Sequence, residues 1–155
     1  MKNINMALQA NHDYILSPKV RDHSSTIESI FIGTKDFVFS YPKKVDKHTW
    51  RSSSMSGTVK SQYFVKEGKE PIEYFQNLLQ NPELTLAQLE AELKRESETN
   101  EHAQFFRIRD FKKFIVKMGF ISNTIYVANK IFDAYTFNGF PRALKPEIKA
   151  FYGEN

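Results

Sequence analysis

The chain of 155 residues contains no cysteine, and this absence excludes several kinds of chemistry. Without thiols there is no disulfide bond, iron–sulfur cluster, thiolate zinc site or cysteine nucleophile. Catalytic signatures that need no cysteine are missing too, since the sequence has no Walker loop, no Gly-x-Ser-x-Gly and no His-x-x-x-His. The four histidines lie in polar surroundings. The sequence therefore predicts a non-enzymatic protein without a metal or cofactor.

Long hydrophobic runs are also missing. The longest stretch without a charged residue, Met118 to Asn129, includes polar side chains, whereas a spanning helix needs about 20 apolar residues. The first ten residues, MKNINMALQA, hold one lysine and no continuous apolar stretch, which is unlike a signal peptide. Apolar residues make up 41% of the chain, enough for the core of one domain. We therefore expect a single soluble domain, 26–155, in the cytoplasm.

The net charge of +4 is distributed in blocks. Residues 35–66 hold seven basic and two acidic side chains, and residues 103–155 hold nine basic and four acidic ones. Between these blocks, residues 67–102 hold nine acidic and three basic side chains. One interpretation is an acidic helical surface packed beside a basic sheet. The other is a basic face that attracts phosphate groups or an acidic protein.

The first half of the chain has strand patterns. Residues 1–25 are polar and rich in Asn and Ser, which predicts a surface arm. Residues 27–41 predict a β-hairpin, because β-branched and aromatic residues flank the turn residues Gly33-Thr34-Lys35-Asp36. Pro42 would end the second strand or place it at an edge. A loop is then expected over 43–57 and a strand over 58–66, with Val59, Tyr63 and Val65 on one apolar face.

Residues 67–101 predict a helical insert. Pro71 suits a first helical position, and Asn81-Pro82 ends the first helix. A second helix begins with a capping box between Thr85 and Gln88. Leu84 and Leu89 are expected to form the hydrophobic staple at the start of this helix, and Leu86, Leu89 and Leu93 are expected to form its buried face. Glu90 and Lys94 are expected to form an ion pair on its solvent-exposed face.

Residues 104–138 allow two interpretations. The first is four strands, 105–108, 113–118, 124–129 and 132–137, with a break at Asp110 and a turn over 119–123. The second is a helix from Phe105 to Met118 that Gly119 would end. The β-branched residues near 115–116 and 124–127 favour strands. Residues 141–152 predict a closing amphipathic helix, which begins at Pro141 or Pro146 and ends at Gly153.

Two segments carry a family resemblance: IFIGTKDFVFSYPKK (30–44) and FFRIRDFKKFIVKMGFISNTIYVANKIFDAYTFNGF (105–140). The second resembles the middle strands of bacterial pleckstrin-homology-like and GRAM-like domains. The resemblance covers about half the chain and implies an α+β fold, an antiparallel barrel or sandwich of about seven strands with a C-terminal capping helix. In such folds basic residues around the first hairpin loop hold lipid headgroups, but here that loop has one lysine opposed by an aspartate.

The candidate binding residues lie in the expected loop after Pro42: Lys43, Lys44, Lys47, Trp50 and Arg51. Lysines and arginines beside an aromatic ring can contact phosphate and stack on a base, or interact with an anionic membrane surface. With His48, the same loop could also serve a small ribonuclease. The leucine-rich insert and an open sheet edge instead favour a protein partner or a second copy. The sequence therefore predicts a module for protein binding or self-association, with recognition of anionic lipid or nucleic acid as the alternative.

Overall fold

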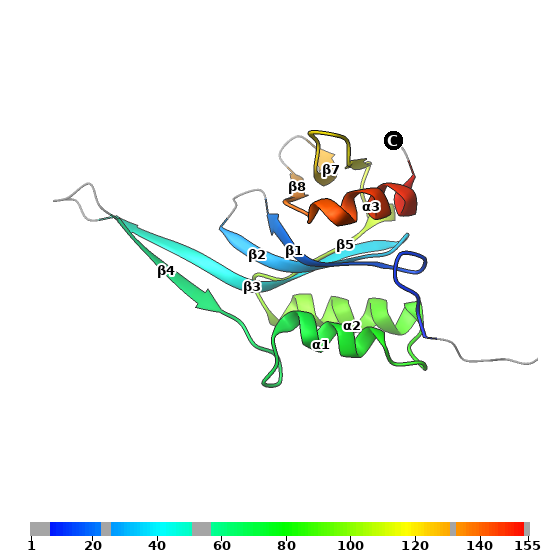
Figure 1. Ribbon diagram of the computed structural model, residues 1–155, viewed down its shortest axis with the longest axis horizontal. Helices are drawn as coiled ribbons and strands as arrows, with labels where there is room; N and C mark the ends of the chain where they lie inside the picture. The colour runs from blue at the N-terminus through cyan, green and yellow to red at the C-terminus, as the bar shows by residue number, and fades with distance from the viewer. Residues whose placement is uncertain (1–6, 23–25, 51–56, 131–132, 154–155) are drawn as a thin grey trace, which may run out of the picture.

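The computed structural model describes residues 7–22, 26–50, 57–130 and 133–153 (Figure 1). Within these ranges the fold is α+β, with three helices and one antiparallel sheet of eight strands. The strands are β1 (Ile15–Asp22), β2 (Ile27–Gly33), β3 (Phe37–Trp50), β4 (Gly57–Tyr63), β5 (Gln104–Arg107), β6 (Lys113–Lys117), β7 (Thr124–Lys130) and β8 (Asp133–Asn138). The helices are α1 (Pro71–Leu79), α2 (Leu86–Thr99) and α3 (Lys145–Tyr152), with 3-10 turns η1 (Ile108–Asp110) and η2 (Arg142–Leu144).

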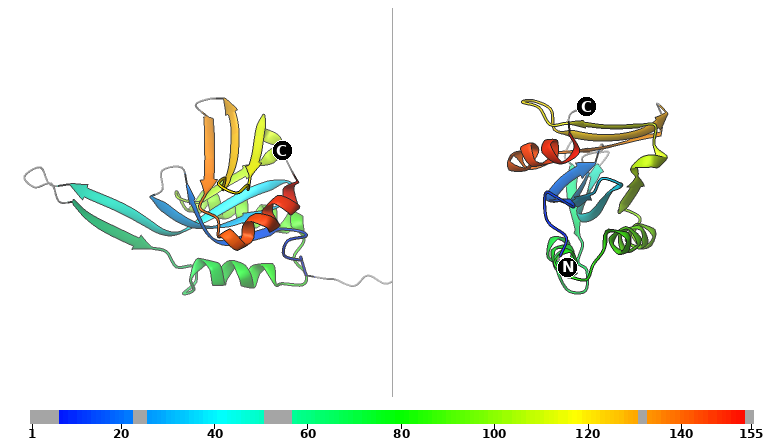
Figure 2. Two further views of the ribbon diagram at one scale, coloured as in Figure 1. Left: turned by 45° about the horizontal axis from the view of Figure 1, so that its top comes forward. Right: turned by 90° about the vertical axis from the view of Figure 1, so that its right-hand side faces the viewer.

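The sheet has the order β4-β3-β2-β1-β8-β7-β6, and β5 pairs with the other end of β3. Strand β1 contacts β8 over only two residue pairs, so the sheet changes direction there and β6, β7 and β8 cross over the first strands (Figure 2). Helices α1 and α2 cover the opposite face of β2 and β3 (Figure 2). The strands at the centre are therefore enclosed between two layers.

Strand β2 shows why both faces must be covered. Ile30, Phe31 and Ile32 are consecutive and all fully buried, which is typical of a strand without a solvent face. Ile30 and Ile32 pack in a cluster with α1 and α2, whereas Phe31 packs in a second cluster with β6–β8 and α3. The Phe31 ring lies 5.3 Å from that of Phe137 and 5.0 Å from that of Phe140.

The prediction of a surface arm over residues 1–25 is wrong for Ile15–Asp22. This segment forms β1, which lies inside the sheet between β2 and β8. Its polar residues hid the strand, because Ser17 and Asp22 are buried beside Ile15 and Val20. Strand β1 also explains why the sheet has eight strands where about seven were expected.

The predicted loop over 43–57 is wrong for residues 43–50, which continue β3 without interruption past Pro42. Pro42 lies opposite Ser29 at an irregularity in the register between β2 and β3. Proline is tolerated in a paired strand at such a bulge, because no ladder hydrogen bond is required of its nitrogen. The prediction that Pro42 would end the strand or mark an edge therefore failed.

The four-strand interpretation of residues 104–138 is confirmed, and the rival helix from Phe105 to Met118 is wrong. The break at Asp110 is the 3-10 turn η1. Helices α1 and α2 lie within the predicted insert, and Thr85 and Gln88 form the predicted capping box. Helix α3 begins one residue before Pro146 and ends at Gly153, whose φ is 81°.

Two expectations for α2 are wrong. Leu86 is exposed at the first turn, while Leu84, Leu89 and Leu93 are buried as expected. Glu90 does not pair with Lys94; it accepts two hydrogen bonds from the Arg107 guanidinium of β5, at 2.9 and 2.5 Å. The pairing of α2 with a distant strand cannot be read from helical spacing.

The end of α3 packs on the β2–β3 turn, and this contact requires a glycine. The Tyr152 hydroxyl donates to the Thr34 carbonyl at 3.0 Å, and a Cβ on Gly33 would overlap that hydroxyl and lie 2.9 Å from the Phe31 ring. We expect Gly33→Ala to lower the free energy of unfolding by about 2 kcal/mol through overpacking. Adding Tyr152→Phe should recover part of the loss, as measured by urea denaturation. Equal stability of wild type and Gly33→Ala would contradict this contact.

Two partly buried tyrosines, Tyr135 and Tyr152, predict a loss of stability in alkali. Burial raises the pKa of Tyr152 above its ordinary value of 10, and burial followed by the Asp22 charge raises that of Tyr135. Both groups stabilise the fold fully below pH 10; above it the unfolded chain releases protons that the folded chain retains. The free energy of unfolding should then fall by about 1.4 kcal/mol per pH unit for each tyrosine. Urea denaturation should show a shallower fall for Tyr152→Phe; identical slopes would refute the assignment.

Candidate functional site

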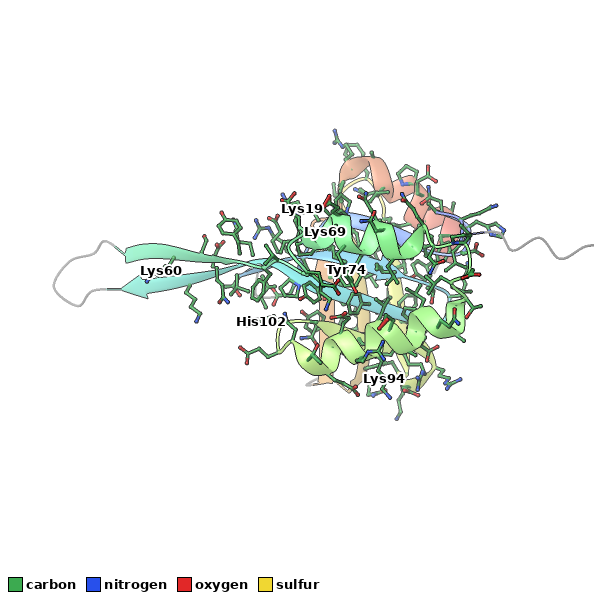
Figure 3. The ribbon with its side chains drawn as sticks, turned by 90° about the horizontal axis from the view of Figure 1, so that it is seen from below. Lys19, Lys60, Lys69, Tyr74, Lys94 and His102 are labelled. Carbon is green, nitrogen blue, oxygen red and sulfur yellow. The ribbon has the colours of Figure 1, made fainter. Side chains whose placement is uncertain are left out.

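The outer part of β3 and the whole of β4 form a ribbon that projects from the body (Figures 1 and 3). The ribbon comprises residues 44–50 of β3 and residues 57–63 of β4, paired in regular antiparallel register from Lys44↔Tyr63 to Trp50↔Gly57. Lys44 and Val45 at its base also pair with β2, so the ribbon is two-stranded from Asp46 outward. Among the described residues β4 pairs only with β3, so its other edge is open. Residues Lys60 to Tyr63 are all exposed. An isolated two-stranded ribbon is only marginally stable in water, so this element is suited to contact a partner.

Two of the predicted binding lysines have carboxylate partners at the base of the ribbon. Lys43 donates to the Pro18 carbonyl at 2.8 Å and lies 3.5 Å from Glu28. Lys44 lies 3.8 Å from Asp46, which also accepts a hydrogen bond from Ser61 at 2.7 Å. These contacts hold the base of the ribbon together, so Lys43 and Lys44 are not free to form a phosphate pocket.

Lys47 differs from Lys43 and Lys44. It lies directly opposite Lys60 in the register of β3 and β4, so both side chains emerge from the same face of the ribbon. Both lysines are exposed, and no carboxylate contacts either of them in the part of the chain that the structure describes. Lys60 lies on the projecting ribbon (Figure 3). Like charges directly opposite each other destabilise a pair of strands. An acidic surface placed against this face would remove that repulsion.

The remaining candidates give less information. Trp50 is the last residue of β3, but its side chain and all of Arg51 lie outside the described residues, as does the side chain of His48. Of the three candidates whose side chains are described, Lys43 and Lys44 have carboxylate partners at the base of the ribbon and Lys47 has none. Lys60 was not among the predicted binding residues, because only the hairpin register pairs it with Lys47, and a predicted loop over 43–57 concealed that register.

A buried ion pair fixes the chain just after the ribbon. Lys66 Nζ lies 2.9 Å from Glu96 of α2 and 5.2 Å from the centre of the Tyr74 ring of α1. Burial alone would lower the pKa of Lys66, but the hydrogen bond and charge of Glu96 raise it above its ordinary value. The side chain of Glu96 is only 8% exposed, and Lys66 is the cation that lies against it.

This ion pair predicts an asymmetry between its two partners. Lys66→Met should cost about 3 kcal/mol, because it leaves a buried carboxylate without a cation. Glu96→Gln should cost less, about 1 kcal/mol, since Lys66 is near enough to the surface to be hydrated. Urea denaturation of both variants checks the order. A larger loss for Glu96→Gln would show that the pair is not held as described.

Helices α1 and α2 present charge of the opposite sign. Exposed carboxylates on and around them have no ion-pair partner among the described residues: Glu67, Glu70, Glu73, Glu83 and Glu98. Strand β4, with seven residues, extends about 23 Å, and α2, with 14 residues, extends about 21 Å. An exposed apolar side chain, Leu86 of α2, accompanies the helical surface. The ribbon and the helical surface therefore match in charge and length.

No family model, curated protein or solved structure matches the chain. Among the described residues, no group of three histidine, aspartate or glutamate side chains is placed to hold a metal ion. No helix of the described ranges combines the length and apolar content that crossing a membrane requires.

Proposed function

We propose that the protein is a non-enzymatic binding module that associates with a second copy of itself. In this association the basic face of the β3–β4 ribbon, with Lys47 and Lys60, lies along the acidic α1–α2 surface of the other copy. The observation that carries the proposal is the uncompensated pair of lysines on a projecting ribbon with an open edge. Its acidic counterpart occurs on the same chain.

A symmetric dimer follows naturally from this arrangement. If the ribbon of one copy contacts the helices of the second, a two-fold axis places the ribbon of the second on the helices of the first. Each contact then occurs twice, and both ribbons gain the cover that each lacks alone.

Nucleic acid is the weaker candidate for the same ribbon. A two-stranded ribbon can enter the major groove, and Lys47 and Lys60 could contact phosphates. However, the nine acidic residues between 67 and 102 repel a polyanion that extends past the ribbon. Lys43 and Lys44, which were expected to bind phosphate, are paired with Glu28 and Asp46. Recognition of anionic lipid or nucleic acid through residues 43–51 thus remains the alternative.

Light scattering at increasing ionic strength tests the proposal. We expect a dimer at low salt that dissociates as salt rises, because exposed ion pairs are screened. A fluorescent oligonucleotide added at low salt tests the alternative in the same samples. A monomer at all salt concentrations would refute self-association, and tight oligonucleotide binding that Lys47→Glu abolishes would establish the alternative.

We further infer a pleckstrin-homology-like relationship and a cytoplasmic location for this module. The three-strand meander β6-β7-β8 followed by the amphipathic helix α3 supports the relationship. The chain differs from the simple form of that fold by α1, α2 and the strand β1. The absence of cysteine agrees with a reducing compartment.

A further inference from the structure

The turn between β6 and β7 exposes two large apolar side chains side by side. Phe120 is 94% exposed and Ile121 is 91% exposed, more than any other large hydrophobic residue that the structure describes. Single exposed apolar residues are common on protein surfaces, but two adjacent ones at the tip of a turn form a small exposed apolar patch. Neither the ribbon nor the helical surface of the proposed dimer includes this turn.

The turn is anchored on both sides, so its tip points away from the body. Met118 before it is buried in the cluster beneath α3. Asn123 after it donates to the Phe140 carbonyl at 2.8 Å and accepts from the Phe140 amide at 3.1 Å. With these fixed ends, Phe120 cannot turn inward without displacing packed residues.

Basic side chains surround the tip, and they come from α3, from the 3-10 turn η2 that precedes it, and from β6. Phe120 shares a shallow hollow of about 450 Å³ with Arg142, Lys145 and Lys149. Lys117 lines an adjoining hollow with Lys149. Glu147, the acidic residue of α3, lines neither hollow. Helix α3 runs beside the turn (Figure 2).

We propose that this end of the molecule docks on an anionic phospholipid membrane. Phe120 and Ile121 enter the boundary between headgroups and acyl chains, and the four cations contact anionic headgroups around them. Stable attachment to a bilayer surface generally needs two weak signals together, an apolar anchor and a basic patch. Both are present here within one turn and its neighbouring helix.

The positive charge around the turn favours an anionic membrane over a second copy of this protein as the binding partner. Two copies meeting through this turn would place four cations against four cations. This surface also differs from a pocket that encloses a single lipid headgroup. Its hollows are shallow, and their cations surround an exposed apolar tip and not an enclosed cavity. The membrane surface as a whole, rather than one soluble headgroup, is therefore the ligand.

Vesicle co-sedimentation tests the proposal. The protein should bind vesicles of phosphatidylcholine mixed with phosphatidylserine and ignore pure phosphatidylcholine, and salt should weaken the binding. Phe120→Ser combined with Ile121→Ser should lower the affinity about 100-fold, and Lys145→Glu should lower it at least about fivefold. Lys112→Glu, at an exposed residue just before β6, is the matched control for charge, because it changes the net charge by the same amount as Lys145→Glu and should leave the affinity unchanged. Inorganic phosphate and soluble glycerophosphoserine should not compete at low concentration.

A second measurement detects insertion directly. In a Trp50→Phe background, Phe120→Trp should show a blue shift of its emission when the mixed vesicles are added. The proposal is overturned if the serine variant binds as well as wild type, or if the tryptophan emission does not move. A change of oligomeric state in the serine variant without vesicles would instead assign the turn to a protein contact.

Discussion

Replacing Phe31 by alanine is expected to remove about 4 kcal/mol from the free energy of unfolding. Phe31 is fully buried, and its ring packs edge-on against Phe137 and Phe140 where the two parts of the sheet meet. A small domain has only about 5–15 kcal/mol of stability, so this one change should lower the urea midpoint severely. If the variant does not fold, Phe31→Leu should give a measurable loss of smaller size.

Leu86→Ala is the matched control for this experiment. Leu86 is also a large apolar residue, but it is exposed on α2, and its truncation should change the free energy of unfolding by no more than about 0.5 kcal/mol. Similar losses for the two variants would mean that β6–β8 do not cover the face of β2 described above. The three-layer account of the fold would then be wrong.

The second large effect concerns self-association. Lys47→Glu combined with Lys60→Glu should raise the dissociation constant of the proposed dimer about a thousandfold. Each exposed ion pair contributes up to about 1 kcal/mol, and a symmetric dimer contains four such pairs, so removing them costs about 4 kcal/mol. The reversed charges also repel the acidic helices, which adds to the loss. Sedimentation velocity at low salt measures the change.

A control variant with the same change in net charge separates this local effect from a general one. Lys112 and Lys113 are exposed and lie far from the ribbon in the strand order. Lys112→Glu with Lys113→Glu should leave the dissociation constant within about threefold of wild type. If both double variants dissociate equally, the contact depends on overall charge and not on the ribbon.

Much of the fold could be predicted where a pattern is local. The capping box of Thr85 and Gln88 and the helix end at Gly153 depend on residues within one turn of each other. The four strands of residues 104–138 were predicted because β-branched residues cluster there. Strand β1 was missed because it lacks a regular alternation of apolar and polar residues. Some of its buried positions hold polar residues such as Ser17, whose burial is evident only in the packed sheet.

The candidate site was predicted only in part, because it depends on register. The basic residues after Pro42 were identified, but as a loop. The continuation of β3 beyond Pro42 depends on a bulge opposite Ser29, which no pattern near Pro42 reveals. As a result, the pairing of Lys47 with Lys60 was not foreseen. Val65 was expected on the apolar face of a strand over 58–66, yet β4 ends at Tyr63 and Val65 is exposed in the segment that follows.

The central claim is that the ribbon of one copy contacts the acidic helices of another, and mixing two non-associating variants tests it most directly. One variant carries Lys47→Glu with Lys60→Glu, and the other carries Glu73→Lys with Glu98→Lys. Each alone should be monomeric, and the equimolar mixture should sediment as a dimer, because each ribbon then faces a helical surface of opposite charge. A mixture that stays monomeric, while the wild type forms a dimer under the same conditions, would contradict the claim.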